Sequence, residues 1–348
     1  MRSRTFIATP PGATIKEQLE DRGMTQKEFA IRMDMSEKHI SQLINGDVQI
    51  TPNVALRLES VLGIPASFWI KLENIYQEKL ARASEEIAMD NDKEIARHMP
   101  YSEMVHLGWI ETARSIEDKV RNLRKFFEVA SLGIIENLMI PGIAYRKVSE
   151  NSQKDYLLAV WAQKARLEAR NQIVSRINLQ KLSCSIPKIR ALTLDPPSVF
   201  CSKLLKIMSE CGIAIVFLPH IKSSFLHGAS FYDGGKIIMA LSVRTHYADS
   251  FWFSLFHEID HILEGHISIN HILIHEDEVH ADNFAKNSLI PFKDYSEFTS
   301  LSSFSSSAVK SFAKKVGIDP GIVVGRLQKE NYIKWEQLNN LKKHYDII

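Results

Sequence analysis

The segment from Phe256 to Leu263 constrains this chain more than any other stretch of its sequence. It contains His257 and His261, four residues apart, with Glu258 directly after the first histidine, in the pattern H-E-x-x-H. On an α-helix, side chains four residues apart lie on one face, so both imidazoles can reach a single ion. Apolar residues around the pattern predict a largely buried helix: Trp252, Phe253, Phe256, Ile259 and Leu263. Buried imidazole and carboxylate groups need polar partners, and a metal ion would provide them.

Glu258 has a different predicted place from the two histidines. It lies about 100° further round the helix than His257, too far to be an obvious third ligand. That position suits a base that touches a water molecule at the metal. The alternative is a helix with two hydrogen-bonded histidines, and seven of the 13 histidines do crowd between residues 246 and 280.

A zinc enzyme commonly uses three protein ligands and leaves a fourth position to water or substrate. The downstream candidates for the third ligand are His266, His271, His275, Glu276, Asp277, Glu278, His280 and Asp282. The pattern H-E-x-x-H-x-x-G-x-x-H fails, because Glu264 stands at the glycine position and His266 comes too early. We favour Glu278, since Asp282 follows it one turn later and could accept the second ring N–H of a zinc-bound histidine. The alternative for Glu278 is a surface carboxylate.

Composition bounds the class of protein. The 348 residues can hold two or three domains, and hydrophobic and charged fractions of 45% and 24% are ordinary for a soluble protein. No apolar run approaches the ~20 residues that span a bilayer, and the N-terminus lacks the apolar core of a secretion signal. The three cysteines are odd in number and lack ligand spacing, which fits reduced thiols. We therefore expect a cytoplasmic protein with no membrane partner.

The N-terminal segment predicts short helices separated by tight breaks: 15–22, 25–33, 36–45, 52–62 and 66–76. Thr25 and Glu28 form a capping-box pattern at the start of the second helix. The second and third helices have the lengths of a helix-turn-helix. The third would enter the major groove of DNA and offer these side chains: Ser36, Glu37, Lys38, Ser41 and Gln42. Gln26, at the start of the second helix, is a candidate phosphate contact.

Residues 10–77 resemble an XRE-type helix-turn-helix of the HigA antitoxin sort. The motifs that carry the resemblance are Pro11-Gly12, the Gly-Met-Thr-Gln turn, Ile44-Asn-Gly46, Ile50-Thr-Pro52, Ala55-Leu-Arg-Leu58 and Phe68-Trp69. The resemblance implies a five-helix, lambda-repressor-like domain over residues 1–80 that binds operator DNA. Its charge is neutral, with 10 Lys/Arg against 10 Asp/Glu, so the alternative is a helical protein-interface module. A homodimer would supply the second half-site, which predicts an inverted repeat as operator.

Residues 81–190 are expected to form a helical connector. Its part from 114 to 190 carries 15 Lys/Arg against 7 Asp/Glu, a net charge of +8 that could attract phosphate. A solvated helical face is the alternative for this charge. Three strands are then predicted over 213–218, 228–232 and 236–241, the last two joined by an Asp-Gly hairpin. The 228–232 strand is the expected free edge, where an extended peptide could add as a further strand.

Residues 190–330 resemble the ImmA/IrrE metallopeptidase family. The motifs that carry the resemblance are Leu241-Ser-Val-Arg244, Asp249-Ser-Phe-Trp-Phe253, the H-E-x-x-H segment, Glu278-x-x-Ala-Asp282-x-Phe-Ala285, Leu289-Ile-Pro291 and residues 318–328. The resemblance implies a gluzincin-like domain over 191–348, so the whole chain is expected to be mainly α with a small β-sheet (α+β). It further implies that Zn²⁺ bound by His257, His261 and Glu278 activates water for peptide hydrolysis, with Glu258 as the base.

The remaining site residues stay open at this point. Candidates for stabilising the oxyanion or binding substrate are Tyr247, Arg244, His246 and His280, while Arg244 and Arg326 could equally brace the fold. The first functional hypothesis is a DNA-binding zinc peptidase that cleaves a transcriptional repressor or a toxin–antitoxin partner. The second is an antitoxin-like regulator whose peptidase-like domain acts as a sensor or partner-binding module without turnover. A third is cleavage of the chain's own segment around 81–100.

Overall fold

The computed structural model describes residues 8–136, 152–221, 227–242, 247–268, 271, 273–301 and 303–345. The chain divides into two compact units, Met1–Glu94 and Ile95–Ile348. The predicted fold class, mainly α with a small β-sheet, is confirmed. The expected division at residue 80 falls inside a single helix, and the expected connector is shared between the two units.

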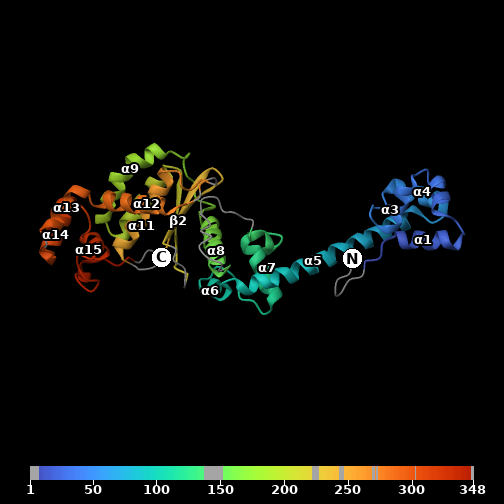
Figure 1. Cartoon of the computed structure of the whole chain (residues 1–348), viewed down its shortest axis with the longest axis horizontal. Helices are drawn as coiled ribbons and strands as arrows, with labels where there is room; N and C mark the ends of the chain where they lie inside the picture. The colour runs from blue at the N-terminus through green and yellow to red at the C-terminus, as the bar shows by residue number, and fades with distance from the viewer. Residues whose placement is uncertain are drawn as a thin grey trace. The chain divides into compact units, whose positions relative to one another are not determined.

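The first unit is helical (Figure 1, blue). Its elements are α1 (Gly12–Asp21), α2 (Gln26–Arg32), α3 (Glu37–Asn45), α4 (Pro52–Leu62) and most of α5 (Ala66–His98). Their apolar faces enclose a core built around Ile15, Phe29, Ile40, Leu58 and Trp69.

The helix boundaries coincide with capping residues that can be recognised in the sequence. The side chains of Thr25, Ser36 and Thr51 each accept a backbone N–H at the start of α2, α3 and α4. Gly46 and Gly63 end α3 and α4 in the left-handed conformation that glycine adopts without strain. The expected capping box is half formed, because the Glu28 carboxylate pairs with Arg32.

The predicted fifth helix, 66–76, and the start of the expected helical connector form one continuous element. The helix does not stop at Tyr76, because α5 runs without a break to His98. No glycine or proline occurs between Pro65 and Pro100, so nothing in that stretch breaks a helix. Glu73 of α5 accepts the backbone N–H of Ile50, which fastens the first turns of α5 to the helix-turn-helix core.

The second unit contains the remaining helices and the sheet. Its α-helices are α6 (Tyr101–His106), α7 (Ile116–Phe127), α8 (Ser152–Ala169), α9 (Leu179–Ala191), α10 (Pro197–Ser209), α11 (Ala248–Leu263), α12 (His275–Leu289), α13 (Phe292–Ser300), α14 (Ser306–Val316) and α15 (Pro320–Lys329). Short 3₁₀ turns are η1 (Leu132–Glu136), η2 (Leu192–Leu194) and η3 (Asn339–Leu341). No helix within the described ranges has the length and apolarity to cross a membrane.

The sheet has the order β1 (Ile213–Leu218), β3 (Lys236–Ser242), β2 (Gly228–Asp233). β1 is parallel and β2 antiparallel to the central strand. Among the residues that the structure describes, β2 is therefore an edge strand, as predicted.

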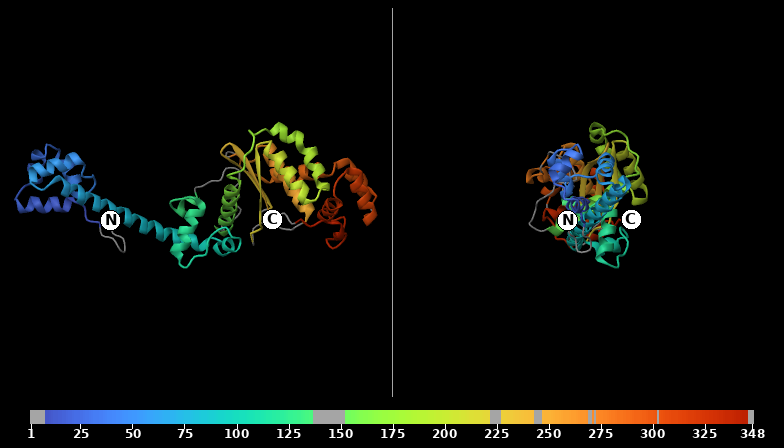
Figure 2. Two further views of the ribbon diagram at one scale, coloured as in Figure 1. Left: turned by 180° about the vertical axis from the view of Figure 1, so that it is seen from behind. Right: turned by 90° about the vertical axis from the view of Figure 1, so that its right-hand side faces the viewer.

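Two helical layers cover the sheet. Helices α10 and α11 pack against one side and α8 against the other, while α12 packs on α11 (Figures 1 and 2). Alternate side chains of β3, Ile237 and Met239 among them, join a core with Trp252 and Phe256 of α11. The periodicity of the strand thus places α11 directly against the sheet.

Two connections show how packing acts on local sequence. Within the expected helical connector, the described residues 131–136 form only the short 3₁₀ turn η1. The serine-rich residues 296–307 are largely helical, because 296–300 belong to α13 and α14 begins at Ser306. Tyr295 and Phe298 are buried on α13, and Ser305 caps α14, so tertiary packing and capping outweigh the local composition.

Candidate functional site

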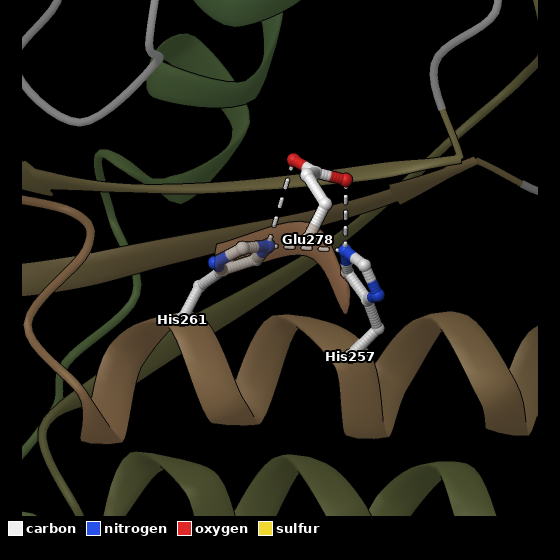
Figure 3. A group of neighbouring side chains, drawn as sticks. All are labelled: His257, His261 and Glu278. Atoms are coloured by element: carbon white, nitrogen blue, oxygen red, sulfur yellow. Dashed lines mark hydrogen bonds and ion pairs between the residues drawn. The ribbon is translucent and has the colours of Figure 1, made fainter. Parts of the chain in front are cut away.

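The two motif histidines lie on one face of α11 and point the same way (Figure 3). The Nε2 atoms of His257 and His261 are 3.0 Å apart. The helix is buried over most of its length, and His261 is 6% exposed. Both histidines therefore present Nε2 to one small volume.

Glu278 reaches the same volume from α12. Its Oε2 is 3.6 Å from Nε2 of His257, and its Oε1 is 3.9 Å from Nε2 of His261. A tetrahedral zinc site with bonds of roughly 2.0–2.2 Å places its ligand atoms about 3.3–3.6 Å apart. The three donor atoms lie within 4.8 Å of one another and thus fit a small cation such as zinc.

Asp282 lies behind the first histidine. Its Oδ1 is 3.0 Å from Nδ1 of His257, so this ring has an outer partner on the side away from Glu278. Burial lowers the pKa of His257, but the bond to Asp282 and the charges of Glu258 and Glu278 together raise it above its ordinary value. Burial and the neighbouring histidines lower the pKa of His261 to about 3, which leaves that imidazole neutral at pH 7.

Glu258 is enclosed between α11 and β2. Ser230 Oγ donates a hydrogen bond of 2.8 Å to its Oε2. A Cβ atom at Gly228 would lie 2.8 Å from both Cγ and Oε1 of Glu258, so only glycine leaves room for this carboxylate. Burial raises the pKa of Glu258 to about 7, against the lowering effects of His257 and Ser230. A carboxyl group with that pKa can take up and release a proton near neutral pH.

Two arginines fasten the helix that carries Glu278. Arg190 donates to the carbonyl oxygen of Leu289, at the end of α12, and Arg326 donates to those of Lys286 and Ile290. The bracing role considered for Arg326 is confirmed by these bonds. Sequence reasoning missed Arg190, Ser230 and Gly228. The small side chains at 228 and 230, two apart on a strand beside the motif, were the available signal for the latter two.

The other predicted site residues are placed differently. The ring of Tyr247 contacts that of His344 at an interplanar angle of 44° and lies beneath the ammonium group of Lys342. His280 bonds to Asp260 through Nδ1 at 2.8 Å, and its side chain is 58% exposed. The structure therefore commits both to contacts outside the histidine–glutamate group. Arg244 and His246 lie outside the described residues.

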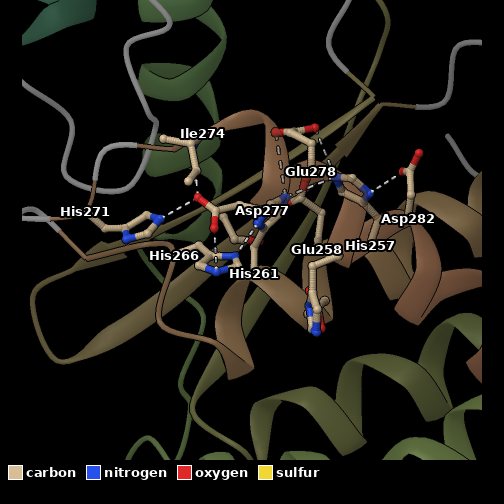
Figure 4. Close-up of polar contacts among 12 residues, drawn as sticks. His257, Glu258, His261, His266, His271, Ile274, Asp277, Glu278 and Asp282 are labelled. Carbon is tan, nitrogen blue, oxygen red and sulfur yellow. Dashed lines mark hydrogen bonds and ion pairs between the residues drawn. The ribbon is translucent and has the colours of Figure 1, made fainter.

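A second group of polar side chains adjoins the first (Figure 4). Nδ1 of His261 is 3.0 Å from Nδ1 of His266. Nε2 of His266 is 3.3 Å from Oδ1 of Asp277, and Nε2 of His271 is 2.7 Å from its Oδ2. In the sequence these residues were candidates only for a third ligand, and the contact of His266 with His261 gives them a different relation to the site.

The helix-turn-helix presents most of its predicted DNA-contacting side chains to solvent. Gln26, Ser36, Glu37, Lys38 and Ser41 are exposed, while Gln42 is half-buried. The opposite face of α3, with Ile40, Leu43 and Ile44, is buried in the domain core.

The turn between α2 and α3 is held by Arg57. This side chain donates to the carbonyl oxygens of Met33 and Asp34, which directly follow α2. The predicted recognition helix is therefore presented by a braced turn.

Comparison with known proteins identifies the N-terminal domain. The helix-turn-helix family (HTH_3) matches residues 15–69. An HTH-type transcriptional regulator of Escherichia coli (strain K12), the uncharacterised YddM, is 32% identical over 66 residues, which are 19% of this chain and 70% of that protein. An addiction module antidote protein of the HigA family from Coxiella burnetii aligns at 24% identity and a TM-score of 0.23, covering 24% of this chain and 94% of that one. The resemblance of residues 190–330 to ImmA/IrrE peptidases stays a prediction. Through residues 15–69 the chain belongs to the helix-turn-helix family of DNA-binding proteins.

Proposed function

We propose that this chain is a DNA-binding transcriptional regulator whose second unit is a zinc-dependent peptidase acting on a regulatory protein. One observation carries the peptidase: Nε2 of His257 and of His261 converge on Glu278, beside the buried Glu258. The helix-turn-helix supports the regulatory part.

The site divides the work of peptide hydrolysis among few residues. His257, His261 and Glu278 would hold a zinc ion, which when bound polarises a carbonyl oxygen and lowers the pKa of a water molecule. Glu258 removes the proton of the attacking water. It then returns that proton to the nitrogen of the broken peptide bond, so that carboxylic acid and amine leave as products. Ser230 holds the Glu258 carboxylate in place for both transfers.

Strand β2 offers a place for the substrate backbone. It pairs with β3 on one side, and its outer edge pairs with no other strand among the described residues. In this strand Ser230 donates a hydrogen bond to Glu258, and Gly228 lies directly against the Glu258 side chain. An extended peptide added along β2 would therefore run past the proposed base.

The second candidate is an antitoxin-like regulator that uses the C-terminal unit to sense or bind a partner without turnover. The family match favours it, since that match lies in the DNA-binding domain. In both candidates two copies of the chain would read an inverted repeat, one half-site each. A repressor or a toxin–antitoxin partner is the protein ligand that we propose.

Glu258→Gln separates the candidates. Zinc-loaded wild type and variant are incubated with a proteome-derived peptide library, and new termini are identified by mass spectrometry. We expect cleavage by wild type and at least about a 100-fold loss in the variant, because general-base catalysis contributes roughly 10²–10⁴-fold.

The control measures DNA binding by the same two full-length proteins. Operators are selected from random duplex DNA, and gel shifts should be equal for wild type and Glu258→Gln. If zinc-loaded wild type binds DNA but cuts no peptide, the first candidate is excluded and the second, a regulator without turnover, is supported. Failure to select any duplex at low salt contradicts both candidates.

A further inference from the structure

Metal binding by His261 would determine which of its two ring nitrogens carries the proton. A neutral imidazole carries its single N–H on one nitrogen and a lone pair on the other. If Nε2 of His261 offers its lone pair to a metal ion, the proton must be on Nδ1. That Nδ1 lies 3.0 Å from Nδ1 of His266, which must then accept the hydrogen bond.

The same reasoning continues outward through His266. With its Nδ1 lone pair used as acceptor, its proton is on Nε2, 3.3 Å from Oδ1 of Asp277. The carboxylate accepts this bond, so each N–H in the sequence His261, His266, Asp277 has an acceptor. The side chains of His266 and Asp277 are only 11% and 13% exposed, so water does not compete freely for these contacts.

Asp277 itself is fixed at the start of α12. Its Oδ2 accepts the backbone N–H of Ile274 at 3.0 Å and also lies 2.7 Å from Nε2 of His271. The residue after it is Glu278, the proposed third ligand. The acceptor at the end of the hydrogen-bond sequence is therefore held by the same helix that carries a ligand.

We propose that His266, held by Asp277, is a positioning residue that fixes the tautomer and ring orientation of His261 for metal binding. This inference rests on the proposed metal site. It gives His261 an outer partner comparable to the one that Asp282 gives His257. Outer partners of this kind restrict a ligating imidazole to the geometry that the metal requires.

The group formed by His266, His271 and Asp277 could instead hold a second ion, since its donor atoms lie within 4.8 Å of one another. The shared proton opposes this. A lone pair on Nε2 of His266 places its proton on Nδ1, which would donate to Nδ1 of His261. His261 would then carry its own proton on Nε2 and could not bind the first ion. With neutral imidazoles, the pair thus permits one ion and not two.

The test measures zinc rather than turnover. Zinc affinity of the full-length chain is determined by competition with a chromophoric chelator, and stoichiometry by native mass spectrometry. Wild type should bind one zinc ion per chain. His266→Leu should weaken zinc binding about 10- to 100-fold, the usual effect of removing an outer partner.

Two matched variants control for packing. His266→Asn places an amide oxygen near the position of Nδ1, where it can accept the N–H of His261, and should restore most of the affinity. His275→Leu removes an exposed histidine at the start of the same helix α12, outside the hydrogen-bond sequence His261, His266, Asp277, and should change zinc affinity less than about threefold.

A direct reading of the tautomers keeps the proposal testable should His266→Leu not fold. Nitrogen-15 histidine spectra of zinc-loaded wild type should show His261 protonated on Nδ1 and His266 on Nε2. Wild type that binds no zinc overturns the metal site itself. Three results would overturn the positioning role alone. The first is that folded His266→Leu binds one zinc ion with unchanged affinity. The others are two zinc ions per wild-type chain, or His266 protonated on Nδ1.

Discussion

At the scale of single residues, the space for the Glu258 carboxylate depends on the residue at position 228. Gly228 has no side chain, and the carboxylate occupies the space that a Cβ atom would need. Ser230, two residues along the same face of β2, donates to the carboxylate. The edge strand β2 therefore helps to position the carboxylate of the proposed base, which is carried by α11.

Gly228→Ala tests this arrangement. The new methyl group would lie 2.8 Å from Cγ and Oε1 of Glu258, so the carboxylate must move. We expect peptide cleavage to fall at least about 10-fold, because a misplaced base loses much of its catalytic effect. Zinc content, measured on the same samples, should be unchanged.

Gly235→Ala is the matched control for that variant. It lies in the turn of the same hairpin, where a Cβ atom would meet nothing within 4 Å. Its activity should equal that of wild type. Equal activity of Gly228→Ala and Gly235→Ala would contradict the close packing of Glu258 against β2.

At the scale of elements, the last turns of α11 carry the two motif histidines, and its first turn carries one member of a buried ion pair. Lys342 lies 2.8 Å from Asp249, and their side chains are 6% and 13% exposed. Gly325 of α15 lies so close that a Cβ atom there would be 2.1 Å from Asp249 Oδ2. Burial raises the pKa of Asp249 above its ordinary value even though Lys342 lowers it.

Lys342→Met should destabilise the second unit by about 3–5 kcal/mol at pH 7, because it leaves a buried carboxylate uncompensated. Without Lys342 the folded-state pKa of Asp249 rises further, so the folded chain takes up a proton more readily than the unfolded one. The lost stability should therefore return as the pH falls through the raised folded-state pKa of Asp249 towards the lower pKa of this group in the unfolded chain. Chemical denaturation at several pH values measures this.

Asp249→Asn combined with Lys342→Met supplies the comparison for that effect. The double variant has no buried charge at this place, and it should be more stable at pH 7 than Lys342→Met alone. A destabilisation of Lys342→Met that is the same at all pH values would show that lost packing, rather than the carboxylate charge, is responsible.

At the scale of the whole molecule, the helix-turn-helix and the proposed metal site belong to units with separate cores. In the first unit, Gly12 permits close packing of α1 on α3, since a Cβ atom there would lie 2.0 Å from the carbonyl oxygen of Ile44. In the second, the three proposed ligands come from α11 and α12. Each function should therefore respond to its own unit.

Calorimetry of the full chain should resolve two unfolding transitions. Zinc should raise the midpoint of only the transition that belongs to the second unit, because a ligand stabilises what it binds. Gly12→Ala should lower only the other midpoint, by at least about 4 °C, because overpacking costs roughly 1–3 kcal/mol. Glu17→Ala, an exposed change on the same helix, should leave both midpoints in place. A single transition that moves as one with zinc and with Gly12→Ala would contradict separate cores.

The sequence by itself determined the features that depend on neighbours along the chain. The caps at Thr25, Ser36 and Thr51, the three strands and the shared face of His257 and His261 all follow from residues within about four positions of one another. The spacing of Glu278 and Asp282 likewise placed both carboxylates on one side of a helix. Local hydrogen bonds and side-chain periodicity are written directly in such patterns.

The tertiary structure decided which of these faces meet. His257 and Asp282 are 25 positions apart and Ser230 and Glu258 are 28 apart, so their contacts arise only when α11 packs against α12 and β2. The partner of His261 could not be read from sequence either, because several histidines and carboxylates stood at similar distances along the chain. Periodicity fixes the direction in which a side chain points, and only the packing of a second element fixes what it meets there.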